Sequence, residues 1–335
     1  MPLVRVTIVT FRRPHLLRRA IASVRAQTHT EWTMEVVNDD PDDAEPARIV
    51  AALGDLRISV LVRQRRMGGA INFNHAFRQG PEPFAALLED DNWWEPAFLS
   101  EMIRALEHHP SAALITGNER IWLEEAGDRW VDSGRTLRPA NDEVRWHSLR
   151  ALEKCGGAIL CNSAVVYRPS AIPRFETPAS MPVDVTEHYR ERLIPHPFLL
   201  HDAALTNFAV TKRTNRSHSG ADWTIQQLLL TASVFASVQP ARRSRLSQQL
   251  WMHVREKDPL NRTTLLLSAR FFPEARALWR DATWPDKLRL AAHLARHRDA
   301  AVRYRRIRSD HADAWAFLCS GPVAEALGRG DDGLA

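Results

Sequence analysis

The first 115 residues alternate short apolar runs with amphipathic segments. The runs are rich in branched residues, which is typical of buried strands, and they cover 4–10, 35–38, 57–62 and 85–88. Between them, apolar residues recur three and four positions apart, which predicts helices after Pro14, at 44–53, at 69–79 and after Pro96. Strands separated by helices imply right-handed crossovers, so we expect an α/β fold with an open, twisted, mostly parallel sheet.

The pattern changes twice further along the chain. Between 119 and 168 it predicts short strands and turns, and from 222 onward it predicts almost only helix, including one long helix at 285–307. We therefore expect a sheet domain at 1–220, with a break near 115, and a helical region at 221–328. The last residues, 329–335, are predicted to be a disordered tail.

Polar residues follow each of the four predicted strands, at 11–13, 38–40, 63–69 and 89–91. The carboxyl ends of parallel strands meet at one edge of a sheet, and ligands bind there in open α/β folds. The last of these segments places three carboxylates side by side, which repel one another unless a positive partner is present. It therefore indicates a cation site, although an acidic cluster that complements the dipole of the following helix explains it as well.

Composition gives an ordinary globular protein: 335 residues, 44% hydrophobic, 25% charged, with a net charge of +5. No apolar run approaches the roughly 18 residues that span a bilayer, and no signal peptide is recognisable. The cysteine count is odd, and the spacing of Cys155 and Cys161 is unusual for zinc. We expect a reduced, cytoplasmic protein.

The positive charge belongs to the last third of the chain. Residues 221–335 carry an excess of six positive charges, whereas residues 1–220 carry an excess of one negative charge. The segment 285–309 holds eight Lys and Arg against Asp286 and Asp299. A solvated face explains this by default; contact with an anionic acceptor, a membrane surface or a second subunit are the alternatives. No aromatic residues interleave in a way that favours nucleic acid.

Four segments follow one another in the order VTIVTFRRPHLLRRAIASVRAQTHTEWTMEVVNDDPDD, GGAINFNHAF, LLEDDNWWEP and CNSAVVYRPSAI. Together they resemble inverting family 2 glycosyltransferases with the GT-A fold. The likeness covers about residues 3–215. It implies a nucleotide-binding half at 1–115 and an acceptor half at 116–220. It departs from the family at Val9, where proline is usual, at Asn38 to Pro41, where Asp-Asp-Gly-Ser is usual, and at Glu89, the first position of the Asp-x-Asp motif.

The resemblance implies that Asp91 binds Mg²⁺ or Mn²⁺ and that Asp90 lies near the ribose. Carboxylate and phosphate oxygens are the ligands that these ions prefer. Nucleotide contacts are expected from Asp39, whose carboxylate suits the imide N–H of uracil or thymine, and from further residues of the same strand ends. These are Thr10, Phe11, Arg13, Gly68 and Asn72. For Arg13 the alternative is a solvated side chain, and for Asn72 it is helix capping.

A general base is expected downstream, in MPVDVTEHYRERL. Asp184 is the first choice, Glu187 one helical turn later is the second, and Asp202 is the third. The resemblance implies an inverting transfer of sugar from a nucleotide-diphosphate donor, UDP- or dTDP-linked, to an acceptor such as a hydroxyl. The alternatives are a GT-A-fold scaffold or sugar-binding protein without catalysis, and a nucleotidyltransferase. The latter requires a glycine-rich loop near the start, where this chain has TFRRP.

Overall fold

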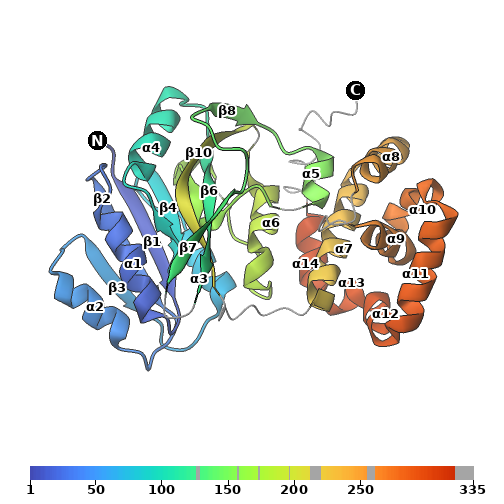
Figure 1. The fold of residues 1–335 in the computed structure, drawn as a ribbon, viewed down its shortest axis with the longest axis horizontal. Coiled ribbons are helices and arrows are strands. Elements are labelled where there is room, and N and C mark those ends of the chain that lie inside the picture. The colour runs from blue at the N-terminus through green and yellow to red at the C-terminus, as the bar shows by residue number, and fades with distance from the viewer. Residues whose placement is uncertain are drawn as a thin grey trace. The chain divides into compact units, whose positions relative to one another are not determined.

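The computed structural model describes residues 1–125, 129–156, 158–172, 174–195, 197–211, 220–254 and 261–320. The chain forms two compact units, each built from three segments that are not contiguous in the sequence (Figure 1). Unit 1 takes Met1–His147, Leu160–Glu176 and Pro197–Asn215, and unit 2 takes Ser148–Ile159, Thr177–His196 and the chain from Arg216 onward. The single boundary predicted at residue 220 stays a prediction, and the predicted tail lies outside the described residues.

Unit 1 is built on one mixed sheet, which has ten strands within the described residues. Its order is β3-β2-β1-β4-β9-β6-β10-β5, with β7 paired to β6 and β8 to β10. The strands are β1 Val4–Thr10, β2 Trp32–Asn38, β3 Ile58–Val62, β4 Phe84–Glu89, β5 Trp93–Trp94, β6 Leu114–Glu124, β7 Trp130–Thr136, β8 Val144–His147, β9 Val165–Tyr167 and β10 Phe198–Val210.

The first four strands are parallel, and their register aligns their carboxyl ends. Thr10 lies opposite Asn38, Asn38 lies opposite Val62, and Val9 lies opposite Glu89. The predicted convergence of the polar loops on one edge is therefore confirmed. Beyond β4 the pairing becomes mixed, because β9 runs antiparallel to both β4 and β6.

Helices cover both faces of the parallel part. The helices of unit 1 are α1 Pro14–Arg25, α2 Glu45–Leu53, α3 Gly69–Ala76 and α4 Phe98–His108. Alternate residues of β1, such as Val6 and Ile8, share one core with Leu17 of α1 and Met102 of α4. On the other face the guanidinium of Arg5 donates to the carbonyl oxygens that follow α3. Proline in the first turn of α1 and of α2 fixes where each helix begins.

Unit 2 is helical, as the sequence predicts. Its helices are α5 Ala151–Cys155, α6 Thr186–Arg190, α7 Gly220–Ser237, α8 Arg243–His253, α9 Arg262–Phe271, α10 Ala277–Asp281, α11 Trp284–Arg296, α12 Arg298–Arg305, α13 Ile307–Asp310 and α14 Ala312–Leu318. The core is built around α7, whose Leu228 and Phe235 are fully buried. The long helix predicted at 285–307 is wrong: the chain leaves helical geometry at His297, with φ −116° and ψ 59°.

Within the described part of the chain, no helix combines the length and the apolar character needed to cross a bilayer.

Candidate active site

The acidic end of β4 is the centre of the candidate site, and Asp90 is fully buried within it. Its side chain is inaccessible to solvent. The hydroxyl of Thr10 donates to Oδ2 at 2.7 Å, and the guanidinium of Arg13 forms an ion pair with Oδ1 at 2.6 Å. Burial raises the pKa of Asp90 above its usual range, and the Arg13 charge opposes that shift. Parallel pairing of β1 with β4 is what brings these residues together.

Asp91 shares the same arginine. Nη1 of Arg13 donates to its Oδ2 at 2.8 Å, so one guanidinium bridges two neighbouring carboxylates. The backbone carbonyl of Asp91 accepts a hydrogen bond from Arg19, whose guanidinium lies over the rings of Trp93 and Trp130 at 3.9 and 4.3 Å from their centroids. The positive charge that the acidic run requires is therefore supplied in this structure by the guanidinium of Arg13.

Glu89 is held by uncharged donors. The hydroxyl of Ser163 donates to its Oε2 at 2.8 Å, and the amide of Asn92 donates to the same oxygen at 3.1 Å. The carbonyl of Ser163 in turn accepts from the indole of Trp94 at 2.6 Å. Arg13 thus stabilises Asp90 and Asp91, whereas Glu89 is held by uncharged groups that include the turn Asn162–Ala164 before β9.

Asp39 anchors the loop that follows β3. Its two carboxylate oxygens accept hydrogen bonds from the backbone N–H groups of Met67 and Gly68, at 2.7 and 2.9 Å. Gly68 has φ +88°, a conformation that glycine adopts without strain. A carboxylate oxygen can accept more than one hydrogen bond, so Asp39 can accept further hydrogen bonds besides those from the loop.

Asn72 holds the same loop from the helix side. Its amide donates to the carbonyl of Gly68 at 3.0 Å, and its Oδ1 accepts from Nε of Arg63 at 2.9 Å. The side chain is fully buried. In this structure both ends of Asn72 are used within the segment that joins β3 to α3.

Phe11 lies directly after β1 and is half-buried. The guanidinium groups of Arg66 and Arg12 lie 4.3 and 5.0 Å from its ring centroid. Arg12 has φ +56°, unusual for a residue with a side chain, and its Nε donates to Asp40. The sequence did not single out Arg12 or Arg66, because no spacing rule links residues 11 and 66.

Glu119 is a further buried acid that sequence reasoning missed. It lies in β6 with 4% of its surface exposed, and the thiol of Cys161 donates to its carboxylate. Burial raises its pKa to about 7, and the nearby charges of Glu89 and Asp91 add to the shift. The signal was present in the sequence: GNE at 117–119 follows an apolar run, as the polar ends of the first four strands do.

The two carboxylates bridged by Arg13 fit a divalent cation whose remaining ligands come from elsewhere. Among the residues that the structure describes, no cluster of three or more His, Cys, Asp or Glu side chains is arranged to hold a metal ion. Magnesium and manganese are commonly bound by one or two carboxylates together with phosphate oxygens and water. Asp91, whose side chain is 13% exposed, can supply such a ligand, whereas the side chain of Asp90 is inaccessible to solvent.

The comparisons with known proteins agree with this geometry. The family model for glycosyl transferase family 2 matches residues 5–172, half of the chain. The chain belongs to glycosyl transferase family 2. The similar proteins include the putative colanic acid biosynthesis glycosyl transferase WcaA of Escherichia coli, 27% identical over 36% of this chain and 43% of that protein. Protein CgeD of Bacillus subtilis is 26% identical over 35% of this chain and 29% of that protein.

This family 2 chain matches less than half the length of these curated relatives. Among solved structures, TarS 1–349 of S. aureus in complex with UDP aligns with a TM-score of 0.58 at 15% identity, covering 93% of this chain and 91% of that one. An identity this low supports the fold alone. The predicted family, the GT-A fold class and the assignment as a glycosyltransferase are thereby confirmed.

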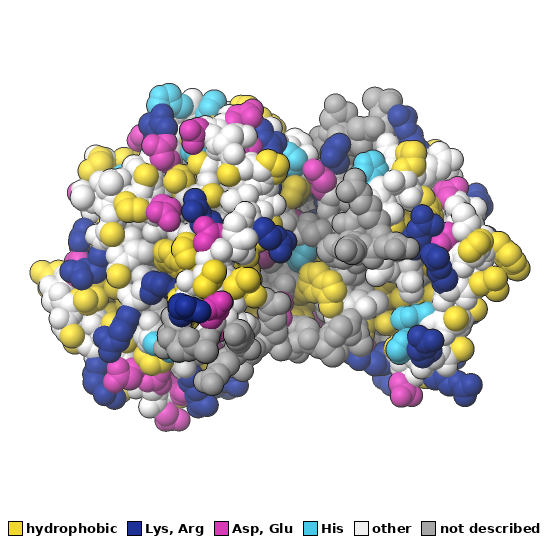
Figure 2. All heavy atoms as spheres, viewed as in Figure 1, with side chains coloured by type: hydrophobic (Ala, Val, Ile, Leu, Met, Phe, Trp, Pro, Cys, Tyr) yellow, Lys and Arg dark blue, Asp and Glu magenta, His cyan; other side chains and the backbone are white. Residues whose placement is uncertain are grey.

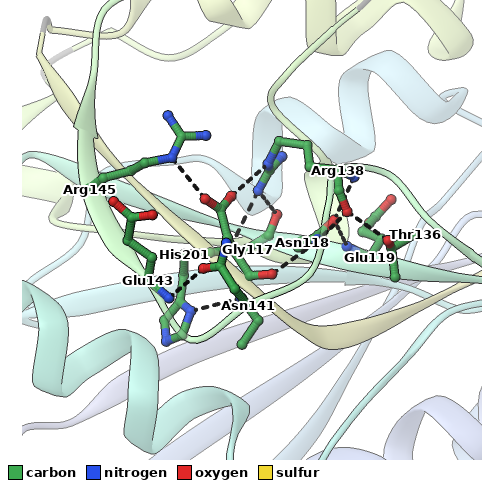
Figure 3. A network of polar contacts seen from close by, with 11 residues as sticks. Gly117, Asn118, Glu119, Thr136, Arg138, Asn141, Glu143, Arg145 and His201 are labelled. Atoms are coloured by element: carbon green, nitrogen blue, oxygen red, sulfur yellow. Dashed lines mark hydrogen bonds and ion pairs between the residues drawn. The ribbon is translucent and has the colours of Figure 1, made fainter.

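The three candidates for the general base lie in different surroundings. Asp184 is exposed and lies just before α6, and Glu187 is half-buried within α6; both belong to unit 2. Asp202 belongs to unit 1, where its oxygens accept from Arg138 at 3.1 Å and from Arg145 at 2.8 Å (Figure 3). Although burial opposes it, these hydrogen bonds hold the pKa of Asp202 below its usual range. Asp202 is thus a poor proton acceptor, and it secures the segment 137–147 to β10.

Proposed function

We propose that this glycosyltransferase moves a sugar from a UDP- or dTDP-linked donor to an acceptor hydroxyl, with inversion and with help from a divalent cation. The observation that supports the proposal most is the Asp90–Arg13–Asp91 arrangement at the carboxyl edge of parallel strands. TarS, whose fold is similar, was crystallised with UDP and with UDP-GlcNAc. A non-catalytic binding protein is the alternative, and the experiments below distinguish the two.

The nucleotide would lie over the ends of β1 and β2. Asp39 would accept the imide N–H of the base with the acceptor capacity that its loop contacts leave. Phe11 would stack on the base, in the position that the Arg66 guanidinium occupies here. Thr10 would hold Asp90 in place, and the contact of Asn72 with Gly68 would hold the loop backbone at the nucleotide.

Asp91 would hold Mg²⁺ or Mn²⁺, and Asp90 beside it would lie near the ribose. A bound cation neutralises the negative charge that builds up on a departing diphosphate. Arg13 would release the carboxylates and donate to phosphate oxygens instead, since guanidinium groups bind both kinds of anion.

Asp184, or Glu187 in its place, would take the proton of the attacking hydroxyl. Inversion follows from a single displacement in which the acceptor attacks opposite to the leaving diphosphate. Asp184 is exposed and so accessible to an acceptor.

The cation site is tested by the melting temperature with UDP or dTDP, in Mn²⁺ and in chelator. The wild-type protein should be stabilised more when metal is present, and Asp91→Ala should abolish that difference while remaining folded. Asp142→Ala, which removes an exposed carboxylate of unit 1, serves as the matched control and should behave as wild type. A metal-dependent shift that survives in Asp91→Ala contradicts the assignment.

The base is tested by turnover. Asp184→Asn should bind nucleotide as the wild type does and lose transfer by a factor on the order of 10² or more. If Glu187→Gln abolishes turnover while Asp184→Asn does not, the base lies one helical turn later. If the wild type binds nucleotide with metal but transfers sugar to no acceptor and hydrolyses no donor, the non-catalytic alternative holds.

A further inference from the structure

Helix α11 carries an apolar stripe that faces water. Trp284 is 73% exposed and Leu288 is 58% exposed, and the small residues Ala291, Ala292 and Ala295 continue the same face as exposed positions. These residues recur at helical spacing, so they form one stripe, while Leu290 on the opposite face is buried. Figure 2 shows hydrophobic side chains at the right-hand edge of the molecule, where Figure 1 draws α10 and α11.

The stripe ends in a groove of about 400 Å³ between α9, α11 and α12. Its floor is apolar and includes Phe271, Leu294 and Val302, and Ala295 belongs to both the groove and the stripe. Three arginines line the same groove: Arg270 from α9, and Arg298 and Arg305 from α12. The groove therefore combines an apolar floor with concentrated positive charge.

Among the residues that the structure describes, the three groove arginines have no acidic partner, whereas several other arginines of unit 2 are paired. Arg262 pairs with Asp286, Arg303 with Asp222, and Arg308 with Glu274. Within the ranges that the structure describes, no carboxylate lies within 4.0 Å of the guanidinium of Arg270, Arg298 or Arg305. The unit neutralises several of its arginines but leaves the charge of the groove available for an anion.

We propose that the stripe and the groove together bind the surface of an anionic lipid bilayer. Tryptophan and leucine next to arginine are typical of helices that lie in the interface of a membrane, with apolar side chains among the acyl chains and cations at the headgroups. A free anion would occupy the arginines and leave Trp284 and Leu288 in water, so the apolar stripe favours a lipid surface. The proposal does not depend on the transfer reaction.

The test is sedimentation of the 335-residue chain with vesicles of phosphatidylcholine alone and of phosphatidylcholine mixed with phosphatidylglycerol. The wild type should bind the anionic vesicles, and added salt should weaken that binding. Replacing Arg270, Arg298 and Arg305 by glutamine should weaken it on the order of 100-fold, because each arginine near an anionic surface contributes about fivefold.

A matched triple variant removes the same charge elsewhere in unit 2. Arg245, Arg276 and Arg280 are exposed and line no part of the groove, so their replacement by glutamine should weaken binding by much less. Trp284→Ala with Leu288→Ala should also reduce binding, whereas Met252→Ala, which removes another exposed apolar side chain, should not. Circular dichroism of each variant establishes that it is folded.

Three outcomes overturn the proposal. Equal losses in the two arginine triple variants would mean that only total charge matters. Binding that is unchanged in the Trp284 and Leu288 variant would mean that the stripe does not insert. Failure of the wild type to bind anionic vesicles would also overturn it. If calorimetry then shows that the wild type binds inorganic phosphate and the groove variant does not, the groove is a site for a free anion.

Discussion

Glu119 carries a buried carboxyl group whose ionisation the fold opposes, and Glu119→Gln removes that group while keeping its shape. Burial moves the pKa from 4.5 to about 7. At about 1.4 kcal/mol for each tenfold change in ionisation constant, that difference corresponds to on the order of 3 kcal/mol. Because the side chain is almost entirely buried, solvent screens little of this energy.

The sign follows from the raised pKa. Below the unfolded pKa both states are protonated, and the residue imposes no ionisation penalty on the fold. As pH rises from 4.5 to about 7, the unfolded chain ionises while the folded one stays protonated, so stability is lost over that range and the loss is complete above it. The glutamine variant has no such loss. The difference in the free energy of unfolding, variant minus wild type, should therefore be larger at pH 8 than at pH 5 by roughly 2 to 3 kcal/mol.

Urea unfolding followed by circular dichroism at both pH values measures this difference. Asp90, whose pKa is also raised, is present in both proteins and cancels in the comparison. Glu143→Gln, an exposed carboxylate of the same unit, should follow the wild type at both pH values. If the Glu119→Gln and wild-type stabilities change in parallel with pH, Glu119 ionises in the fold as freely as in the unfolded chain, and the account of its burial is wrong.

Two further replacements test the ion pairs of unit 1. Arg13→Gln leaves the buried Asp90 without its guanidinium partner and should destabilise the protein by about 3 to 5 kcal/mol in urea unfolding. Adding Asp90→Asn to this variant should recover much of the lost stability. If it recovers none, the pairing is contradicted. Asp202 has a lowered pKa, so its ionised form stabilises the fold above the unfolded pKa, and that stability is lost as pH falls through the folded pKa. Asp202→Asn should therefore be less stable than the wild type at neutral pH, and its free energy of unfolding should fall less steeply as the pH is lowered. An equally steep fall in the variant would refute this.

The parallel half of the sheet was predictable because its signals are local. The strand at Val4–Thr10 is a continuous branched run, and Pro14 marks where α1 begins. Strand β10 was not predicted. Its sequence, FLLHDAALTNFAV, interrupts the apolar pattern with polar residues, and the register shifts between Leu200 and Thr206. Two of its polar side chains are satisfied by distant residues: Asn207 accepts from the indole of Trp122, and Asp202 accepts from two arginines.

The site divides in the same way. Strand ends are visible in a sequence, so the sequence alone singles out Asp39, Asp90 and Asp91. Which partner each carboxylate takes depends on tertiary contact. Arg13 meets Asp90 across 77 positions of chain, and Glu119 meets Cys161, which lies before β9. The predicted helix at 285–307 had a sound apolar period, but periodicity cannot reveal the change of direction at His297.

Arg13 explains how the fold tolerates an acidic strand end in the absence of a donor. Asp90 and Asp91 lie next to each other, one fully buried, and their repulsion would be large without a positive charge between them. The guanidinium supplies that charge from the start of α1, on the neighbouring strand's loop. Under the proposed function, Asp91 would hold the cation and Arg13 would donate to the diphosphate. The cation would supply positive charge beside the two carboxylates when Arg13 leaves them, so no buried charge would be left unpaired.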